Sequence, residues 1–456
     1  MDYFAAGIFT LLLSVVVAIL AVFRWEYGLA LALASLSLVN RVKTVYFLDL
    51  GYAVVTAETV FILLLLFAWI IRVAKPPRIP IIKTYLSGPA FCLFFSGLLS
   101  LLFSLDIRVS MRLLIVGVIE PIVLFYLIIN NIKGIRQVRL IVYGLIASAV
   151  FATVYGLRQI FLTIAETGNP FDYRIVSVFY SPAIFAEILL LSFPLVLVTR
   201  ISLQKSKRVV GLLLDVAFGG MIAGLLLTIT RAAWLGLLVS LAVLLSNREI
   251  RSYFYRRISI VLILLIFFVI LSGAASNLLG LLELFQRRPV SLSDFGDQTS
   301  SVGERIFAWQ TALVMIADNP IGIGLGMFRE TWARYRPISA GLDAAHNLFL
   351  DIGVEMGVLG VMAFIWIAID SVRTSIRLVR TSVDPYIARL GLGILSGLAG
   401  YFTDALSGGA ELAHNVHNVI DPLGSPISTG MLVFWSLFGC LYILRESENT
   451  GEQPIL

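Results

Sequence analysis

The sequence predicts an all-α fold, a polytopic membrane helix bundle of about 12 or 13 transmembrane helices. Of the 456 residues, 59% are hydrophobic and only 14% are charged, whereas soluble domains carry about 25% charged residues. The apolar residues gather in runs long enough to cross a bilayer as helices. These observations exclude a soluble enzyme, a disordered chain and a secreted disulfide scaffold. They also exclude an outer-membrane barrel, whose strands alternate polar and apolar residues.

The apolar runs define the predicted spans, which are listed here in chain order: 5–23, 27–40, 54–71, 86–104, 112–130, 139–163, 177–199, 210–229, 232–246, 258–280, 346–371, 389–407 and 426–444. The second range is short enough to form only half a span. The first has no basic region before it and no small-residue cleavage site after it, so we expect a retained helix and not a signal peptide. Cys92 and Cys440 lie in apolar runs, where we expect reduced core residues and not a disulfide or metal site.

Lysine and arginine gather in one set of alternate loops, and this asymmetry sets the predicted orientation. The set comprises Arg24, Arg72, Lys75, Arg78, Lys83, Lys133, Arg136, Arg139, Arg200, Lys205, Lys207, Arg208, Arg248, Arg251, Arg256, Arg257, Arg373, Arg377, Arg380, Arg389 and Arg445. Because short basic loops remain in the cytoplasm, these loops and the C-terminus are predicted to lie inside. The net charge of +6 therefore reflects topology and gives no reason to expect nucleic acid as a partner.

One outer segment, residues 281–345, is far longer than any other connection. It divides the chain into three parts: residues 1–280 with the first ten predicted spans, the loop itself, and residues 346–456 with the last three spans and a short cytoplasmic tail. Ser301 and Glu304 have the spacing of a helix-capping box. The run from Glu304 to Ala317 is amphipathic, with an apolar stripe of Ile306, Trp309, Leu313 and Ile316. Asp318-Asn319-Pro320 should end this helix, and a second short helix is predicted from Met327 to Arg336. We expect both helices to lie along the outer membrane surface.

Three arginines at the predicted outer face are candidate contacts for an anion. Arg231 stands between two apolar runs, where a charge is costly unless it has a partner or snorkels to the membrane surface. Arg305 lies in the loop helix with Trp309 one turn later, and a solvated or headgroup-facing residue is the alternative. Arg174 precedes another span and could equally anchor that helix at the interface. A guanidinium stays charged at any working pH and matches the oxygens of phosphate.

His346 opens the helix after the long loop and is the candidate general base, because an unperturbed histidine titrates near pH 6.5. An interfacial or capping role is the alternative. Asn347, Asp351 and Glu355 recur down the same helix as a polar stripe, which should face the bundle and not lipid.

The remaining histidines, His414 and His417, lie in the last outer loop and are candidates for an acceptor site, with a plain polar loop as the alternative that the pattern favours. A metal site there would need further strong ligands, so we expect no metal. Gly322, Gly324 and Gly326 do not have the spacing of a nucleotide-binding loop.

The location of these residues favours a particular chemistry. Several arginines suit a diphosphate, and a histidine suits deprotonation of a hydroxyl. Nucleotide-activated donors are cytoplasmic, so a transferase at the outer face needs a donor that is itself a membrane lipid. A polyprenyl-diphosphate sugar meets this requirement, and arginines would replace a metal as the stabilisers of the leaving diphosphate.

The residues from 303 to 364 resemble the O-antigen ligase and O-antigen polymerase family. The likeness rests on Glu304-Arg305 with Trp309, on Asn319-Pro320 followed by 322–328, and on His346-Asn347 with Leu350, Glu355-Met356-Gly357, Gly360 and Phe364. Thr230-Arg231-Ala232-Ala233-Trp234 and the segment from Arg174 to Ala186 resemble further parts of the family, with Thr in place of Ser and Ala in place of Gly in the first of these.

The resemblance implies a GT-C-like, metal-independent and inverting glycosyltransferase of the bacterial inner membrane. Its donor would be a glycan on undecaprenyl diphosphate, its acceptor a glycan or lipid core, and its active site would face the periplasm in lipopolysaccharide or other surface-polysaccharide biosynthesis. The family's arginines and histidine correspond to Arg231, Arg305 and His346, with Asn347, Glu355, Trp309 and Glu304 as supporting residues; no cofactor is implied. A flippase or transporter of lipid-linked sugars is the alternative function, and a non-catalytic assembly subunit is a further one. The resemblance does not separate ligase from polymerase.

Overall fold

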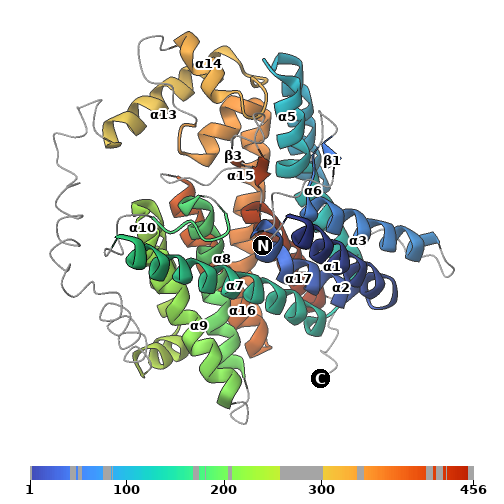
Figure 1. The fold of residues 1–456 in the computed structure, drawn as a ribbon. Helices are drawn as coiled ribbons and strands as arrows, with labels where there is room; N and C mark the ends of the chain where they lie inside the picture. The colour runs from blue at the N-terminus through green and yellow to red at the C-terminus, as the bar shows by residue number, and fades with distance from the viewer. Residues whose placement is uncertain are drawn as a thin grey trace.

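The computed structural model confirms an all-α polytopic membrane bundle (Figure 1). It describes residues 3–41, 48–49, 54–74, 84, 86–167, 174–179, 181–203, 208–256, 301–335, 344–406, 414–416, 425–427 and 429–449. By length and composition, 6 helices of this described part could each cross a membrane, or up to 7 if the bent pair Arg231–Leu245 and Arg248–Arg256 counts as one span. The fold class predicted from composition is therefore correct.

The helices follow the apolar runs of the sequence. Their bounds are α1 Tyr3–Phe23, α2 Trp25–Arg41, α3 Ala57–Ala74, α4 Ser87–Ser100, α5 Ile107–Leu114, α6 Glu120–Asn131, α7 Ile135–Thr167, α8 Pro182–Ser202, α9 Arg208–Leu227, α10 Arg231–Leu245, α13 Ser301–Asp318, α14 Phe328–Tyr335, α15 Leu348–Thr381, α16 Pro385–Ala405 and α17 Thr429–Asn449. A 3-10 turn, Leu101–Phe103, extends α4, and a π-helix, Ile115–Ile119, joins α5 to α6. Most predicted spans overlap one of these helices. The span 112–130 covers the end of α5, the π-helix and most of α6, and 258–280 lies outside the described residues.

Two short antiparallel hairpins were not predicted. Strand β1 (Leu48–Asp49) pairs with β2 (Val54–Val55), and β3 (His414–Val416) pairs with β4 (Ser425–Ile427). Both belong to connections that are predicted to lie on the outer side.

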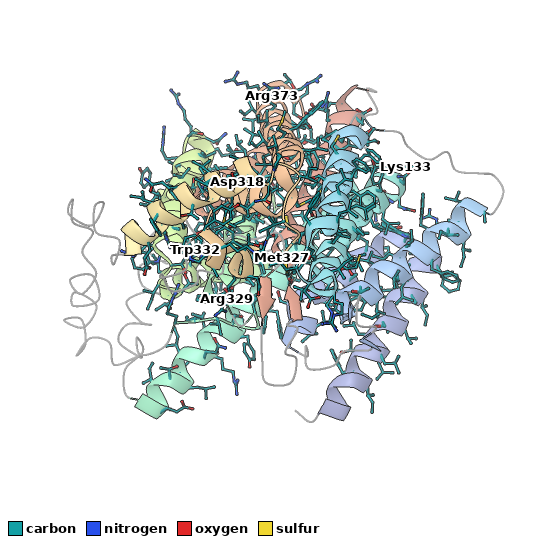
Figure 2. The ribbon with its side chains drawn as sticks, turned by 90° about the horizontal axis from the view of Figure 1, so that it is seen from above. Lys133, Asp318, Met327, Arg329, Trp332 and Arg373 are labelled. Carbon is teal, nitrogen blue, oxygen red and sulfur yellow. The ribbon has the colours of Figure 1, made fainter. Side chains whose placement is uncertain are left out.

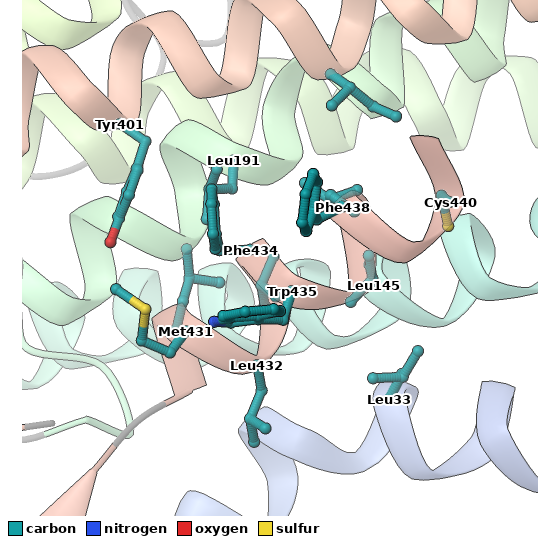
Figure 3. Packing of buried hydrophobic residues seen from close by; sticks show 14 of the residues in the cluster. Leu33, Leu145, Leu191, Tyr401, Met431, Leu432, Phe434, Trp435, Phe438 and Cys440 are labelled. Atoms are coloured by element: carbon teal, nitrogen blue, oxygen red, sulfur yellow. The ribbon is translucent and has the colours of Figure 1, made fainter. Parts of the chain in front are cut away.

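Helix α17 occupies the centre of the bundle, because its residues are apolar and buried around the whole circumference from Met431 to Leu444. Its aromatic side chains pack against those of α6 and α16, and Figure 3 shows Phe434 and Trp435 of α17 with Tyr401 of α16. Phe125 of α6 lies 5.7 Å from Trp435 in an edge contact, and Tyr401 of α16 stacks on Phe434 at 6.0 Å between ring centroids. In contrast, α1 exposes Leu11 and Leu12 as lipid-facing helices do.

Helices α10 and α16 cross closely because small residues face each other. A side chain on Gly236 would meet the carbonyl oxygen of Gly400 at 2.6 Å, so neither position has room for one. One turn away, Ser240 and Ser396 bring their hydroxyl oxygens to 2.8 Å. Such small-residue contacts are a common way to pack membrane helices at short distance. They fix the register of α10, whose first residue is Arg231, against α16.

The predicted loop helices form as α13 and α14, and α13 begins and ends where the sequence signals place it. They share a small apolar core with the start of α15, in which Phe328 and Trp332 stack at 5.8 Å. The face of α13 that packs into this core is Ala308, Ala312 and Met315, while Leu313 of the predicted stripe is 58% exposed. Exposed Leu313 suits the predicted contact with the membrane surface. In Figure 2, Trp332 and Arg329 lie well away from Arg373, which is at one edge of the bundle.

A break in α15 provides the docking place for the loop between α13 and α14. Gly357 adopts φ 78 and ψ −175, which separates α15 into two helical pieces. The carbonyl groups released by the break accept hydrogen bonds from this loop: Ile323 N–H donates to Val354 O, and Gly324 N–H donates to Glu355 O, both at 3.1 Å. In return, Val358 N–H donates to Pro320 O at 2.9 Å. The break therefore attaches the α13–α14 unit to the bundle by backbone contacts.

We predict that Gly357→Ala loosens this attachment. The new Cβ would need a backbone conformation that L-residues avoid and would collide with Pro320 O, so the free energy of unfolding should fall by about 2 kcal/mol. Thermal unfolding in detergent measures the change. Gly88→Ala is the matched control, because a Cβ there meets nothing within 4 Å. Equal melting temperatures for the two variants would contradict the role of the break.

Candidate functional site

Arg231 is the first residue of α10 and follows a tight turn after α9. Ile229 in that turn adopts φ 52, a left-handed conformation that is unusual for a β-branched residue. The N-terminus of α10 carries the positive end of the helix dipole, so Arg231 adds a full charge to a place that already favours anions. The turn thus builds a strongly electropositive point from backbone and side chain together.

Arg174 holds this turn in place. Its Nε donates to Thr228 O at 3.0 Å, and its Nη2 donates to the Thr230 hydroxyl at 2.8 Å. The segment that carries Arg174 is fixed in turn by Gln159 of α7, whose side chain exchanges two hydrogen bonds with the backbone of Ser177. Arg174 therefore contacts the turn that directly precedes Arg231, and its role as an anion contact stays a prediction.

Arg305 of α13 is half-buried and lies in the field of Arg231. Burial lowers the pKa of Arg305 below its ordinary value, Arg231 lowers it further, and the carboxylate of Asp404 opposes both effects. The influence of Arg231 on Arg305 places two arginines from different segments near each other. An additional anion at this place would relieve the repulsion between the two guanidinium groups.

Asp404, near the end of α16, is the site residue that sequence reasoning missed. It is 0% exposed, and neither carboxylate oxygen has a hydrogen-bond partner within the described part of the chain. The facing pairs Gly236–Gly400 and Ser240–Ser396 place Asp404 level with Ala232, next to Arg231. The signal was available, because a carboxylate inside a predicted span is by default functional.

His346 lies immediately before α15, in a backbone conformation that the neighbouring residues enforce. Its φ is 54, which costs on the order of 1 kcal/mol for a residue other than glycine. The carboxylate of Asp351 accepts a hydrogen bond from Ala345 N–H at 2.7 Å and another from Asn347 N–H at 3.3 Å. Trp309 Nε1–H donates to Ala345 O at 3.1 Å. Because Trp309 is one turn from Arg305 on α13, this last contact joins the arginine-bearing helix to the histidine segment.

Asn347 joins the same segment to α16. Its side-chain oxygen caps α15 by accepting from Phe349 N–H and Leu350 N–H, and its Nδ2 donates to Leu406 O at 3.0 Å. Leu406 is two residues beyond Asp404. Hydrogen bonds thus link the middle of α13 and the C-terminal end of α16 to the segment that carries His346.

The other predicted supporting residues are placed as follows. Glu355 accepts from Gly326 N–H at 2.8 Å and so holds the α13–α14 loop. Glu304 is exposed on α13. His414 lies in β3, but its side chain and the whole of His417 are outside the described residues, so their role stays a prediction. Within the described residues, no group of three or more His, Cys, Asp or Glu side chains could hold a metal ion.

Comparison with known families gives one match. Residues 216–365 match the model of a family described as O-Antigen ligase. Over this stretch, which is about a third of the chain, the sequence is similar to the O-antigen ligase family, and the match supports an assignment to that family. The matched stretch includes Arg231, Arg305 and His346, whereas Arg174 and Asp404 lie outside it. No curated protein matches the chain. The family indicates an enzyme of the glycosyltransferase and ligase type, acting on lipid-linked glycans in a membrane.

We predict that Arg174→Ala destabilises the turn before α10. A charged hydrogen bond contributes about 1.5–3 kcal/mol, so the free energy of unfolding should fall by about 2 kcal/mol. Arg174→Lys should restore little, because an ammonium cannot contact Thr228 O and the Thr230 hydroxyl with the same fork geometry. Melting in detergent is the measurement, and Arg158→Ala, which removes an exposed arginine of α7, is the control. An unchanged melting temperature of Arg174→Ala would contradict the prediction that Arg174 stabilises the turn.

Proposed function

We propose that the protein transfers a glycan from undecaprenyl diphosphate to an acceptor hydroxyl at the periplasmic face of the bacterial inner membrane, without a metal. The observation that carries the proposal is the proximity of Arg231 and Arg305, two like charges from separate segments beside the His346 helix. Holding two guanidinium groups together is costly unless an anion binds between them. A diphosphate is the anion whose geometry and charge suit two planar forks.

In the proposed reaction, the arginines bind the diphosphate of the donor lipid. As the bond between the anomeric carbon and the diphosphate oxygen breaks, negative charge grows on the leaving group. Arg231, Arg305 and the N-terminus of α10 stabilise that charge. This stabilisation replaces the metal that many glycosyltransferases use.

His346 acts on the acceptor in this mechanism. Its imidazole takes the proton from the acceptor hydroxyl while the hydroxyl oxygen attacks the anomeric carbon. The attack comes from the side opposite the diphosphate, so the configuration at that carbon inverts. The proton then leaves to solvent at the periplasmic face, and undecaprenyl diphosphate is the second product.

The fixed backbone supports this division of roles. A general base must be within hydrogen-bond distance of the hydroxyl it deprotonates, so its backbone must not drift. Asp351, Trp309 and Asn347 hold the residues on both sides of His346. The strained φ of His346 is typical of residues at functional sites.

The identity of the acceptor distinguishes a ligase, which transfers the glycan to a lipid core, from a polymerase, which transfers it to a growing chain. Incubation of the purified protein with lipid-linked oligosaccharide separates the two activities.

We predict that Arg231→Ala and Arg305→Ala each lower turnover about 10²-fold or more, because each removes a donor that stabilises the leaving diphosphate. Release of undecaprenyl diphosphate from the lipid-linked glycan is the measurement. Lysine at either position should restore activity only in part, and EDTA should leave the wild type active. Arg329→Ala, at an exposed position on α14, is the control. Full activity of both alanine variants, or complete loss of wild-type activity in EDTA, would be incompatible with the arginine mechanism.

For His346 we predict a loss of about 10²- to 10⁴-fold in turnover on substitution by glutamine, which is polar but accepts no proton near neutral pH. Binding of undecaprenyl diphosphate should persist, because the arginines and the lipid chain supply it. His414→Ala should have a smaller effect. A normal rate in His346→Gln together with an inactive His414→Ala would assign the base to the last outer loop.

A further inference from the structure

Asp351 faces the histidine segment from the first turns of α15, and the site described above does not give it a chemical role. It is 7% exposed, and each of its two carboxylate oxygens accepts a hydrogen bond from a neighbour of His346. One oxygen accepts from Ala345 N–H at 2.7 Å, and the other accepts from Asn347 N–H at 3.3 Å. The carboxylate therefore bridges the backbone on both sides of the histidine.

The bridge explains how His346 keeps a left-handed backbone. A residue with φ 54 returns to an ordinary conformation unless its surroundings prevent it. Rotation of His346 about φ would move Ala345 N–H relative to Asn347 N–H, and a single carboxylate bonded to both resists that movement. Trp309 also restrains Ala345, because its Nε1–H donates to the carbonyl oxygen of Ala345.

We infer that Asp351 is the positioning residue of the reaction, which holds His346 in the orientation that lets its imidazole reach the acceptor hydroxyl. This inference rests on the proposed role of His346 as general base. Asp351 does not contact the donor in this account. It acts through the backbone, and its effect should appear in the rate of the chemical step and not in donor affinity.

A helix-capping role for Asp351 makes a different prediction. Carboxylates in the first turn of a helix often accept from backbone N–H groups before it, and their loss lowers stability. Capping alone would not require the second bond to Ala345, which lies two residues before the cap residue Asn347. A pure cap would change the melting temperature and leave the turnover of the folded protein unaltered.

Asp351→Asn is the sharpest substitution, because it keeps the size of the side chain. An amide has one acceptor oxygen and one NH₂ donor, so it can accept from only one of the two backbone N–H groups and repels the other. Displacement of a reacting group by about 1 Å can reduce the rate about 10²-fold, so we expect kcat to fall between about 10- and 100-fold. Affinity for undecaprenyl diphosphate in detergent should stay within about twofold, since the arginines are untouched. Asp384→Asn is the matched control, because Asp384 caps α16 by accepting from Tyr386 N–H at the end of that helix opposite Asp404.

A double variant tests whether the effect passes through the histidine. If Asp351 acts only by positioning His346, then Asp351→Asn should cause no further loss in a His346→Gln background. A further loss of the same 10- to 100-fold would show an independent role and overturn the inference.

If Asp351→Asn fails to fold, Trp309→Phe provides a second test, because it removes the other hydrogen bond that restrains Ala345. We expect kcat to fall several-fold at unchanged donor affinity, and an unchanged kcat would overturn the inference.

The outcomes separate this inference from the proposed function. Normal turnover of His346→Gln would refute the histidine mechanism itself, and the positioning role with it. Normal turnover of Asp351→Asn beside an inactive His346→Gln would refute the positioning role alone. A parallel fall in kcat and in donor affinity would also refute it, because Asp351 would then support the donor site.

Discussion

The proximity of two arginines and one buried carboxylate is the constraint on which the rest of the site depends. Arg231 and Arg305 repel each other, and Asp404, which is fully buried, offsets part of that repulsion. In surroundings of low dielectric constant, an anion bound beside the two guanidinium groups would reduce their mutual repulsion further. The proposed diphosphate site follows from this repulsion, and the remaining structure serves to maintain it against the tendency of like charges to separate.

The scaffold maintains the arrangement through backbone contacts more than through side-chain packing. The small residues of the α10–α16 crossing set the distance between Arg231 and Asp404. The break at Gly357 attaches α13, and hence Arg305, to α15. Among the described residues other than glycine, those with positive φ are Ser177, Ile229 and His346, and each lies in a segment that carries a site residue. Strained backbone of this kind is retained where the surrounding contacts compensate for it and the geometry matters.

Hydropathy and helix signals were sufficient to predict the bundle and the two loop helices, because long apolar runs and the sequence from Ser301 to Pro320 determine their structure locally. Arg231, Arg305 and His346 could be predicted as site residues because charged or titratable side chains at membrane boundaries are often functional. The sequence indicated only that all three lie on the same side of the membrane, and their proximity was inferred from that. The break at Gly357 was not predicted, since a glycine in an apolar helix does not reveal the loop that will dock on its carbonyl groups. Asp404 was missed although a carboxylate within a span is itself a signal. The bridging role of Asp351 depends on the conformation of His346, which a residue pattern cannot show.

The central claim is that Arg231, Arg305 and His346 form one site for a lipid diphosphate. An experimental structure of the protein bound to undecaprenyl diphosphate in a lipid nanodisc tests it most directly. We predict diphosphate oxygens within hydrogen-bond distance of both guanidinium groups, with the lipid chain leaving toward the membrane and His346 facing the position of the transferred sugar. A diphosphate bound away from these arginines, or one that leaves His346 remote from the anomeric position, would contradict it.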